Sequence, residues 1–67
     1  MRLDGIAATR IFYGRDGKVD AQPCILAYSK PMTAQQAIER ILLGRTVFVT
    51  AEDAPAVLAA VRGGTHA

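Results

Sequence analysis

Few side chains in this 67-residue chain could do covalent chemistry, and those few are far apart in the sequence. Cys24 is the single cysteine and His66 the single histidine. A catalytic cysteine needs a histidine or a helix N-terminus beside it to lower its pKa, but His66 is next to the last residue. One cysteine and one histidine also cannot form a closed zinc site. We therefore predict no catalytic nucleophile, no metal site and no cofactor, and we expect Cys24 to be a small buried hydrophobe.

The carboxylates do not form a catalytic pair that the sequence can identify. General acid–base catalysis requires two carboxyl groups in different environments. Glu52 and Asp53 are adjacent, but they precede a predicted helix, where negative charge is stabilising. Asp16 falls in a predicted turn, and Asp20 can pair with a base on the same hairpin. We therefore do not expect an enzyme.

The stretch from Gly14 to Lys18 reads G-x-x-G-K, which resembles part of a phosphate-binding loop. Such a loop requires four residues between its glycines, a Ser or Thr after the Lys, and a following helix. None of these is present here. Asp16-Gly17 instead predicts a two-residue hairpin turn of type I′, with Gly14 marking a bulge.

Length and composition predict one small domain. Hydrophobic residues make up 51% of the chain, and the net charge is +2 with a pI of about 9.1. We expect a domain over residues 1–62 and a flexible tail over 63–67. The single cysteine favours a reducing compartment. No apolar run approaches the roughly 20 residues of a membrane helix, and no signal peptide is apparent. We therefore predict a cytoplasmic protein that does not bind membranes.

Two strands are predicted in the first half of the chain, over about 6–15 and 18–28. Their β-branched and aromatic residues suit a pleated surface. A two-residue turn places Tyr13 opposite Asp20 and Thr9 opposite Cys24. Pro23 cannot donate to a ladder, so we expect either a bulge or a sheet edge there.

The second half predicts a helix, a strand and a second helix. Thr33 and Gln36 form a capping box, and Gly44 fits the position after the helix end. The strand over 45–50 is apolar on both faces, which favours a central position in the sheet. The second helix starts at Thr50 or Asp53 and ends at Gly63-Gly64. The expected apolar stripes are Ala34, Ala37, Ile38, Ile41 and Leu42 in the first helix, and Ala54, Val57, Leu58 and Val61 in the second.

The predicted fold is of the α/β (α+β) class, in the order β-β-α-β-α, with both helices on one face of a three-stranded sheet. The sequence leaves open whether the third strand runs parallel or antiparallel to its neighbour. Two short helices cannot cover all the apolar strand residues, so some must point away from them. Exposed apolar patches of this kind mark interfaces. We therefore expect a homodimer or a complex with another protein.

By elimination, the chain is expected to act by binding a protein, in part through an acidic surface on the partner. The aromatic and basic residues of the strands are the predicted contacts, because these types dominate interface energies: Arg10, Phe12, Tyr13, Arg15, Lys18 and Tyr28. In size and composition the chain resembles the inhibitors encoded by phages and mobile elements, anti-CRISPR proteins among them, and small antitoxins and adaptors. The alternative is a nucleic-acid-binding accessory protein that uses the basic, aromatic hairpin.

Overall fold

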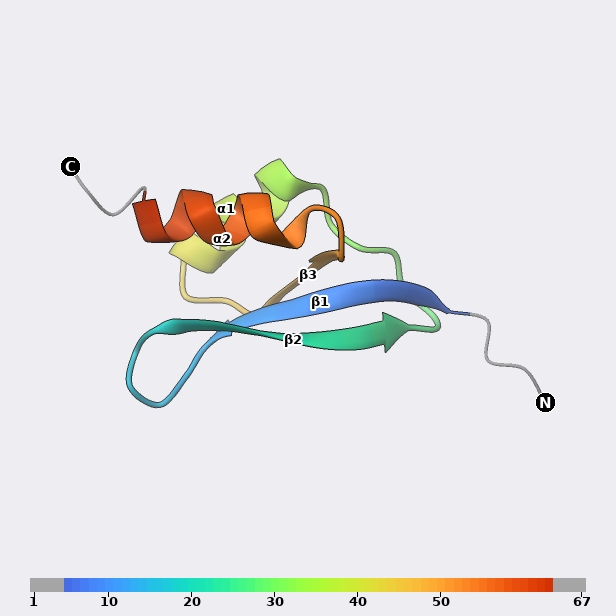
Figure 1. The fold of residues 1–67 in the computed structure, drawn as a ribbon, viewed down its shortest axis with the longest axis horizontal. Coiled ribbons are helices and arrows are strands. Elements are labelled where there is room, and N and C mark those ends of the chain that lie inside the picture. Colours follow the sequence, from blue (N-terminus) through green and yellow to red (C-terminus); the bar gives the residue numbers. More distant parts are fainter. Residues whose placement is uncertain (1–4, 64–67) are drawn as a thin grey trace.

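The computed structural model describes residues 5–63, and they form one small domain in the predicted order of elements (Figure 1). A long hairpin is followed by a helix, a short strand and a second helix. The elements are β1 (Ile6–Tyr13), β2 (Val19–Leu26), α1 (Ala34–Leu42), β3 (Val47–Thr50) and α2 (Ala54–Gly63). Gly63 of the predicted tail is thus part of α2, whereas 64–67, with His66, lie outside the described residues.

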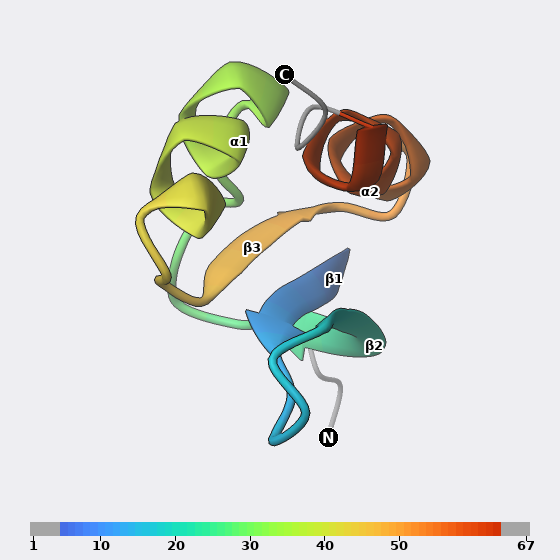
Figure 2. The same ribbon diagram turned by 90° about the vertical axis from the view of Figure 1, so that its left-hand side faces the viewer.

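The sheet has the strand order β2-β1-β3, and β1 is antiparallel to both neighbours. This decides the orientation that the sequence left open. Both helices lie on one face of the sheet, as predicted (Figure 2). The expectation of a central position for 45–50 was wrong, because β3 is an edge strand and β1 is central. Val47 and Val49 of β3 are covered by the helices, and the segment at Met32 pairs with Val49 at the outer edge.

The core lies between the sheet and the two helices. Ile11 of β1 lies between Ala21 and Val47 in the register, so the three strands present apolar side chains to the same face. The helices contribute the larger share of the remaining core. The buried cluster consists of Ile11, Ala37, Ile41, Val47, Val49, Ala54, Val57 and Val61. Leu42, which we placed on the buried stripe of the first helix, is 56% exposed because it follows Ile41 around the helix and leaves the core side.

Both helices begin and end where the sequence predicts. The Thr33 hydroxyl accepts a hydrogen bond from the N–H of Gln36, which caps α1. At the other end Gly44, with φ +86°, donates to the Ile41 carbonyl, and Arg45 donates to the Arg40 carbonyl. These two bonds form a Schellman motif, which satisfies carbonyls that the helix leaves unpaired.

The start of α2 combines the two residues between which the sequence could not choose. Asp53 is the N-cap residue of α2, because its carbonyl accepts the first hydrogen bond of the helix, from the N–H of Val57. The Thr50 hydroxyl accepts from the N–H of Asp53, 3.1 Å away. None of the helices in the described part of the chain is long and apolar enough to span a membrane.

The predicted hairpin register was wrong by one residue. Tyr13 lies opposite Val19, Thr9 opposite Pro23, and the pairing continues without a bulge at Pro23. The reason lies in the turn, where Gly17 donates to the Gly14 carbonyl and has φ +80°. This is a three-residue loop, a type I turn followed by a left-handed glycine that forms a bulge, instead of a two-residue type I′ turn. The bulge glycine is therefore Gly17 and not Gly14.

The Gly17→Ala substitution tests this turn. A side chain in the left-handed region costs roughly 1–2 kcal/mol, so we expect the free energy of unfolding to fall by about that amount in urea denaturation. Gly63→Ala is the matched control, because Gly63 is helical and an added Cβ there meets nothing within 4 Å. Equal effects of the two substitutions would contradict the turn assignment.

Candidate functional site

The six predicted contact residues lie on three separate surfaces. Tyr13 and Lys18 line a hollow beside the C-terminal end of α2, and Arg15 is in the adjoining turn. Arg10 and Phe12 lie on the face of the sheet away from the helices. Tyr28 is fully exposed in the connection after β2. The six therefore do not form one binding surface, and each group has to be considered by itself.

The hollow between the hairpin and α2 has a volume of about 340 Å³ and is mostly apolar. Tyr13 and Val19 come from the two hairpin strands, and Val61 comes from α2. Lys18 and Arg62 add two cationic side chains to its wall. The Arg62 guanidinium donates a 3.5 Å hydrogen bond to the Val19 carbonyl, so one of these cations is attached to the edge of β2.

The same end of the molecule is basic. The hairpin turn and the C-terminal ends of α1 and α2 all lie at this end of the molecule (Figures 1 and 2). These segments contain five of the seven cations in residues 5–63 and three of the five carboxylates, Asp16, Asp20 and Glu39, which leaves a net charge of +2 (five minus three). Glu52 and Asp53 lie at the opposite end, at the start of α2. The five cations are Arg15, Lys18, Arg40, Arg45 and Arg62.

The second surface is the sheet face that no described helix or strand covers, which we call the open face (Figure 2). The side chains that alternate with the core residues point to it, since successive residues of a strand face opposite sides. Arg10 lies there between Gln22 and Phe48, and its guanidinium is 4.3 Å from the centre of the Phe12 ring. Residues of the open face are Ile6, Ala8, Arg10, Phe12, Asp20, Gln22, Cys24, Leu26, Phe48 and Thr50.

The Arg10 side chain is held in place by this stack. Its Nε atom is buried and has no hydrogen-bond partner in the described part of the chain. A guanidinium placed over an aromatic ring can still donate hydrogen bonds from its remaining N–H groups to a carboxylate. Arg10 therefore presents a positioned cation in the middle of an otherwise largely apolar surface.

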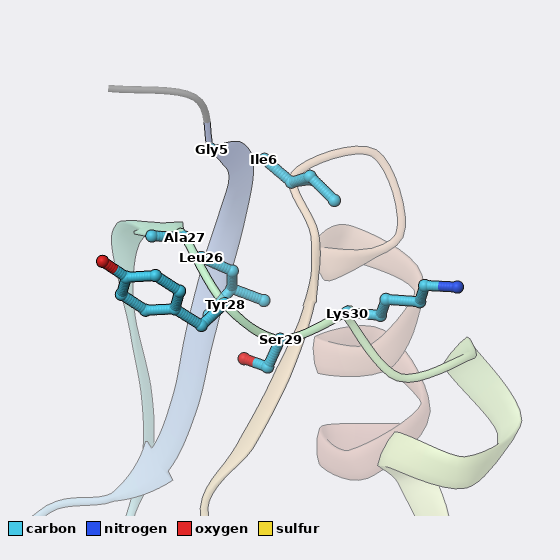
Figure 3. A pocket seen from close by; sticks show the side chains of 7 residues that line it. All are labelled: Gly5, Ile6, Leu26, Ala27, Tyr28, Ser29 and Lys30. Atoms are coloured by element: carbon cyan, nitrogen blue, oxygen red, sulfur yellow. The ribbon is translucent and has the colours of Figure 1, made fainter. Parts of the chain in front are cut away.

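The third surface is a wide hollow of about 530 Å³ at the other end of the hairpin, lined by residues 5, 6 and 26–30. Its polar side chains do not converge. In Figure 3 the Tyr28 ring and the Lys30 ammonium point in opposite directions, and the Ser29 hydroxyl points in a third. A small-molecule site requires a few polar groups directed at one point, so this arrangement gives no candidate binding site.

The side chains singled out for possible chemistry are also separated in space. Cys24 is half-buried on the open face instead of in the core, because the register places it opposite Ala8 and not opposite Thr9. The Asp16 and Asp20 carboxylates each accept a hydrogen bond from a nearby backbone N–H, of Lys18 and Ala21. Within residues 5–63 no three of the His, Cys, Asp and Glu side chains are grouped so that they could hold a metal ion.

Sequence reasoning missed two residues of these surfaces. Arg62 was not selected because only the folded chain brings the end of α2 to the hairpin. Phe48 was assigned to a buried strand, although the alternation of Val47, Phe48 and Val49 could have placed it on the opposite face from its neighbours. No protein-family model, no curated protein and no solved structure matches this chain.

The Arg10–Phe12 stack can be measured by a double-mutant cycle with Arg10→Met and Phe12→Leu, which keep most of the apolar volume. A partly exposed cation–π pair contributes about 0.5–1 kcal/mol, so we expect a coupling free energy of that size in urea denaturation. All four proteins are compared at one concentration, since association would alter apparent stability. Strictly additive effects, within about 0.3 kcal/mol, would show that the stack contributes nothing.

Proposed function

We propose that the protein is a non-enzymatic binding module that docks an acidic segment of another protein at its basic end. The hollow beside Tyr13 receives an apolar side chain of the partner, and Lys18 and Arg62 face carboxylates that flank it. The observation that carries the proposal is the combination of an apolar hollow with two cations in its wall.

The shape of the hollow supports an anchored side chain. Binding energy at protein interfaces concentrates in aromatic or aliphatic groups that fill pockets and exclude water. A volume of about 340 Å³ is at the lower end of the range for ligand pockets, which suits one large side chain of a peptide. Tyr13 is 38% exposed and supplies an aromatic wall with a hydroxyl at its tip.

The charges of this end support an acidic partner. Complementary potentials raise the association rate and disfavour partners of the wrong charge. Arg40 and Arg62 lie in the last turns of their helices, where they also complement the helix dipoles. Arg15 and Lys18 have no such structural role and extend from the turn, so we assign the steering of the partner to these two.

The action that fits a chain of this size is occlusion. A 67-residue protein can block a partner's surface without a converging set of polar side chains, and no such set is found in residues 5–63; a stoichiometric inhibitor or an adaptor acts in this way. The proposal places the protein in the cytoplasm, among inhibitors of the kind that phages and mobile elements encode. The partner's active or assembly surface would then contain the acidic segment.

Binding of nucleic acid by the same basic end is the second candidate, since five cations lie in the segments that form it. Three carboxylates accompany them, however, and phosphates bind preferentially at helix N-termini, whereas both helices direct their C-termini here. These observations favour the protein partner.

The experiment compares two charge reversals of equal size at opposite ends of the molecule. Lys18→Glu alters the wall of the hollow, and Lys30→Glu is the matched control in the connection after β2. Tagged proteins are incubated with lysate of the source cells, and captured proteins are quantified by mass spectrometry. We expect Lys18→Glu and Tyr13→Ala each to lower recovery of the partner at least tenfold, which corresponds to about 1.4 kcal/mol, and Lys30→Glu to change it less than twofold.

Circular dichroism of each variant establishes that it is folded. Equal losses with Lys18→Glu and Lys30→Glu would mean that only overall charge matters and would overturn the proposal. Loss of the captured protein after nuclease treatment, together with oligonucleotide binding that weakens steeply with salt, would support the nucleic-acid alternative instead.

A further inference from the structure

We infer that the open face is covered by a second copy of this chain, stacked face to face about a two-fold axis, with Arg10 of each copy paired to Asp20 of the other. This inference does not rest on the proposed function, because it concerns a different surface. It follows from how the edges of the sheet are closed, from what the open face contains, and from the placement of its charges.

The outer edge of β2 cannot easily take another strand. The Ala21 N–H, which points away from β1, donates to the Asp20 carboxylate at 2.8 Å. Donor directions alternate along a strand, so the next outward donor position is Pro23, which has no N–H. The outward Val19 carbonyl accepts from Arg62. These features hinder edge-to-edge pairing with another sheet, and native proteins commonly protect their edge strands in such ways.

The outer edge of β3 is closed as well. Met32 donates a 2.8 Å hydrogen bond to the Phe48 carbonyl and forms a parallel bridge with Val49. Because both edges are at least partly blocked, we assign association of this sheet with a second copy to its open face. A sheet-on-sheet contact packs such faces about 10 Å apart, through side chains that interdigitate.

The open face has the composition of an interface centre. Its apolar members come from all three strands, and none belongs to the buried core cluster. Ile6 is 45% exposed, and Phe12 and Phe48 are only partly buried. Aromatic and aliphatic side chains that stay partly open to water on one face of a sheet are typical of an association surface. Ala8 lies on this face but is buried, and the apolar members that remain exposed or half-exposed are Ile6, Phe12, Cys24, Leu26 and Phe48.

The charges of the open face are one positive and one negative. They therefore match a second copy of the same face better than a partner surface that is uniformly acidic or basic. The face holds one cation, Arg10, and one carboxylate, Asp20, which lies opposite Phe12 on the neighbouring strand. Within one chain Arg10 stacks on Phe12 and Asp20 accepts from Ala21. When a two-fold axis runs across the strands between Arg10 and Phe12, each Arg10 lies over the partner's Phe12, beside the partner's Asp20. Isologous contacts of this kind are the commonest in homodimers.

The area fits a modest dimer. Two strands of eight residues and one of four, at about 3.4 Å per residue and about 4.8 Å between strands, span roughly 330 Å² of plane. With side-chain relief, two such faces bury on the order of 1,000 Å², which is near the lower limit for a specific interface. We therefore expect dissociation constants in the micromolar range instead of an obligate dimer.

The test uses charge reversals and their mixture, with mass measured by analytical ultracentrifugation from about 1 to 100 µM. Wild type is expected to be dimeric at the upper concentrations. Arg10→Asp and Asp20→Arg should each raise the dimer dissociation constant at least tenfold. The contact between residues 10 and 20 occurs twice in a two-fold dimer, and either substitution gives both contacts two like charges. An equimolar mixture of the two variants should form a heterodimer, because each contact then joins opposite charges. Arg45→Asp, in the connection between α1 and β3, is the control and should dimerise like wild type.

The mixture also guards against misfolding, since unfolded variants could not restore a specific dimer. A monomeric wild type at 100 µM would overturn the inference and leave the open face to a different protein. A dimer that survives both reversals would overturn it too, because the contact would then lie elsewhere. Dimerisation restored in the mixture supports it, and this outcome does not depend on any partner bound at the basic end.

Discussion

The left-handed conformation of Gly17 fixes the hairpin register, and most of the molecule depends on that register. With this turn Ile11 lies opposite Ala21, and Val19 and Ala21 face the helices. A shift of one residue would reverse both faces of β2. Asp20 and Gln22 would then take the half-buried positions of Val19 and Ala21 on the helix side, where polar groups are disfavoured unless they find hydrogen-bond partners. The bulge therefore determines which surface becomes the core and which remains open.

That constraint also explains how the sequence could predict the fold but not the register. Thr33, Gly44 and the apolar spacing of both helices are local signals, and the structure bears them out except at Leu42, which is exposed. Asp-Gly fits both a two-residue and a three-residue turn, so the turn sequence alone was ambiguous. The polarity of Asp20 and Gln22 contained the missing information, since only one register directs both away from the helices.

The candidate surfaces were harder to predict, because they depend on elements that meet only after folding. The aromatic and basic residues of β1 were identifiable from the sequence. However, Arg10 and Tyr13 are an odd number of residues apart, so their side chains lie on opposite sides of the sheet. Arg62 reaches the edge of β2 from the far end of the chain. The outer side of β3 is bridged by the short segment at Met32, which has no signal of its own in the sequence.

The small size of the chain links its two proposed surfaces. A domain of this length buries only about 60% of its unfolded surface, and here the buried cluster uses one face of the sheet. Aromatic and aliphatic residues on the other face contribute little while they remain in water, whereas stacking two copies adds a second apolar layer to each. Dimerisation on the open face would leave the hollow beside Tyr13 uncovered, because Tyr13 shares its side of β1 with Ile11 and the helices. A dimer of this geometry presents two basic ends, so an acidic partner with two binding segments would be held more tightly than one with a single segment.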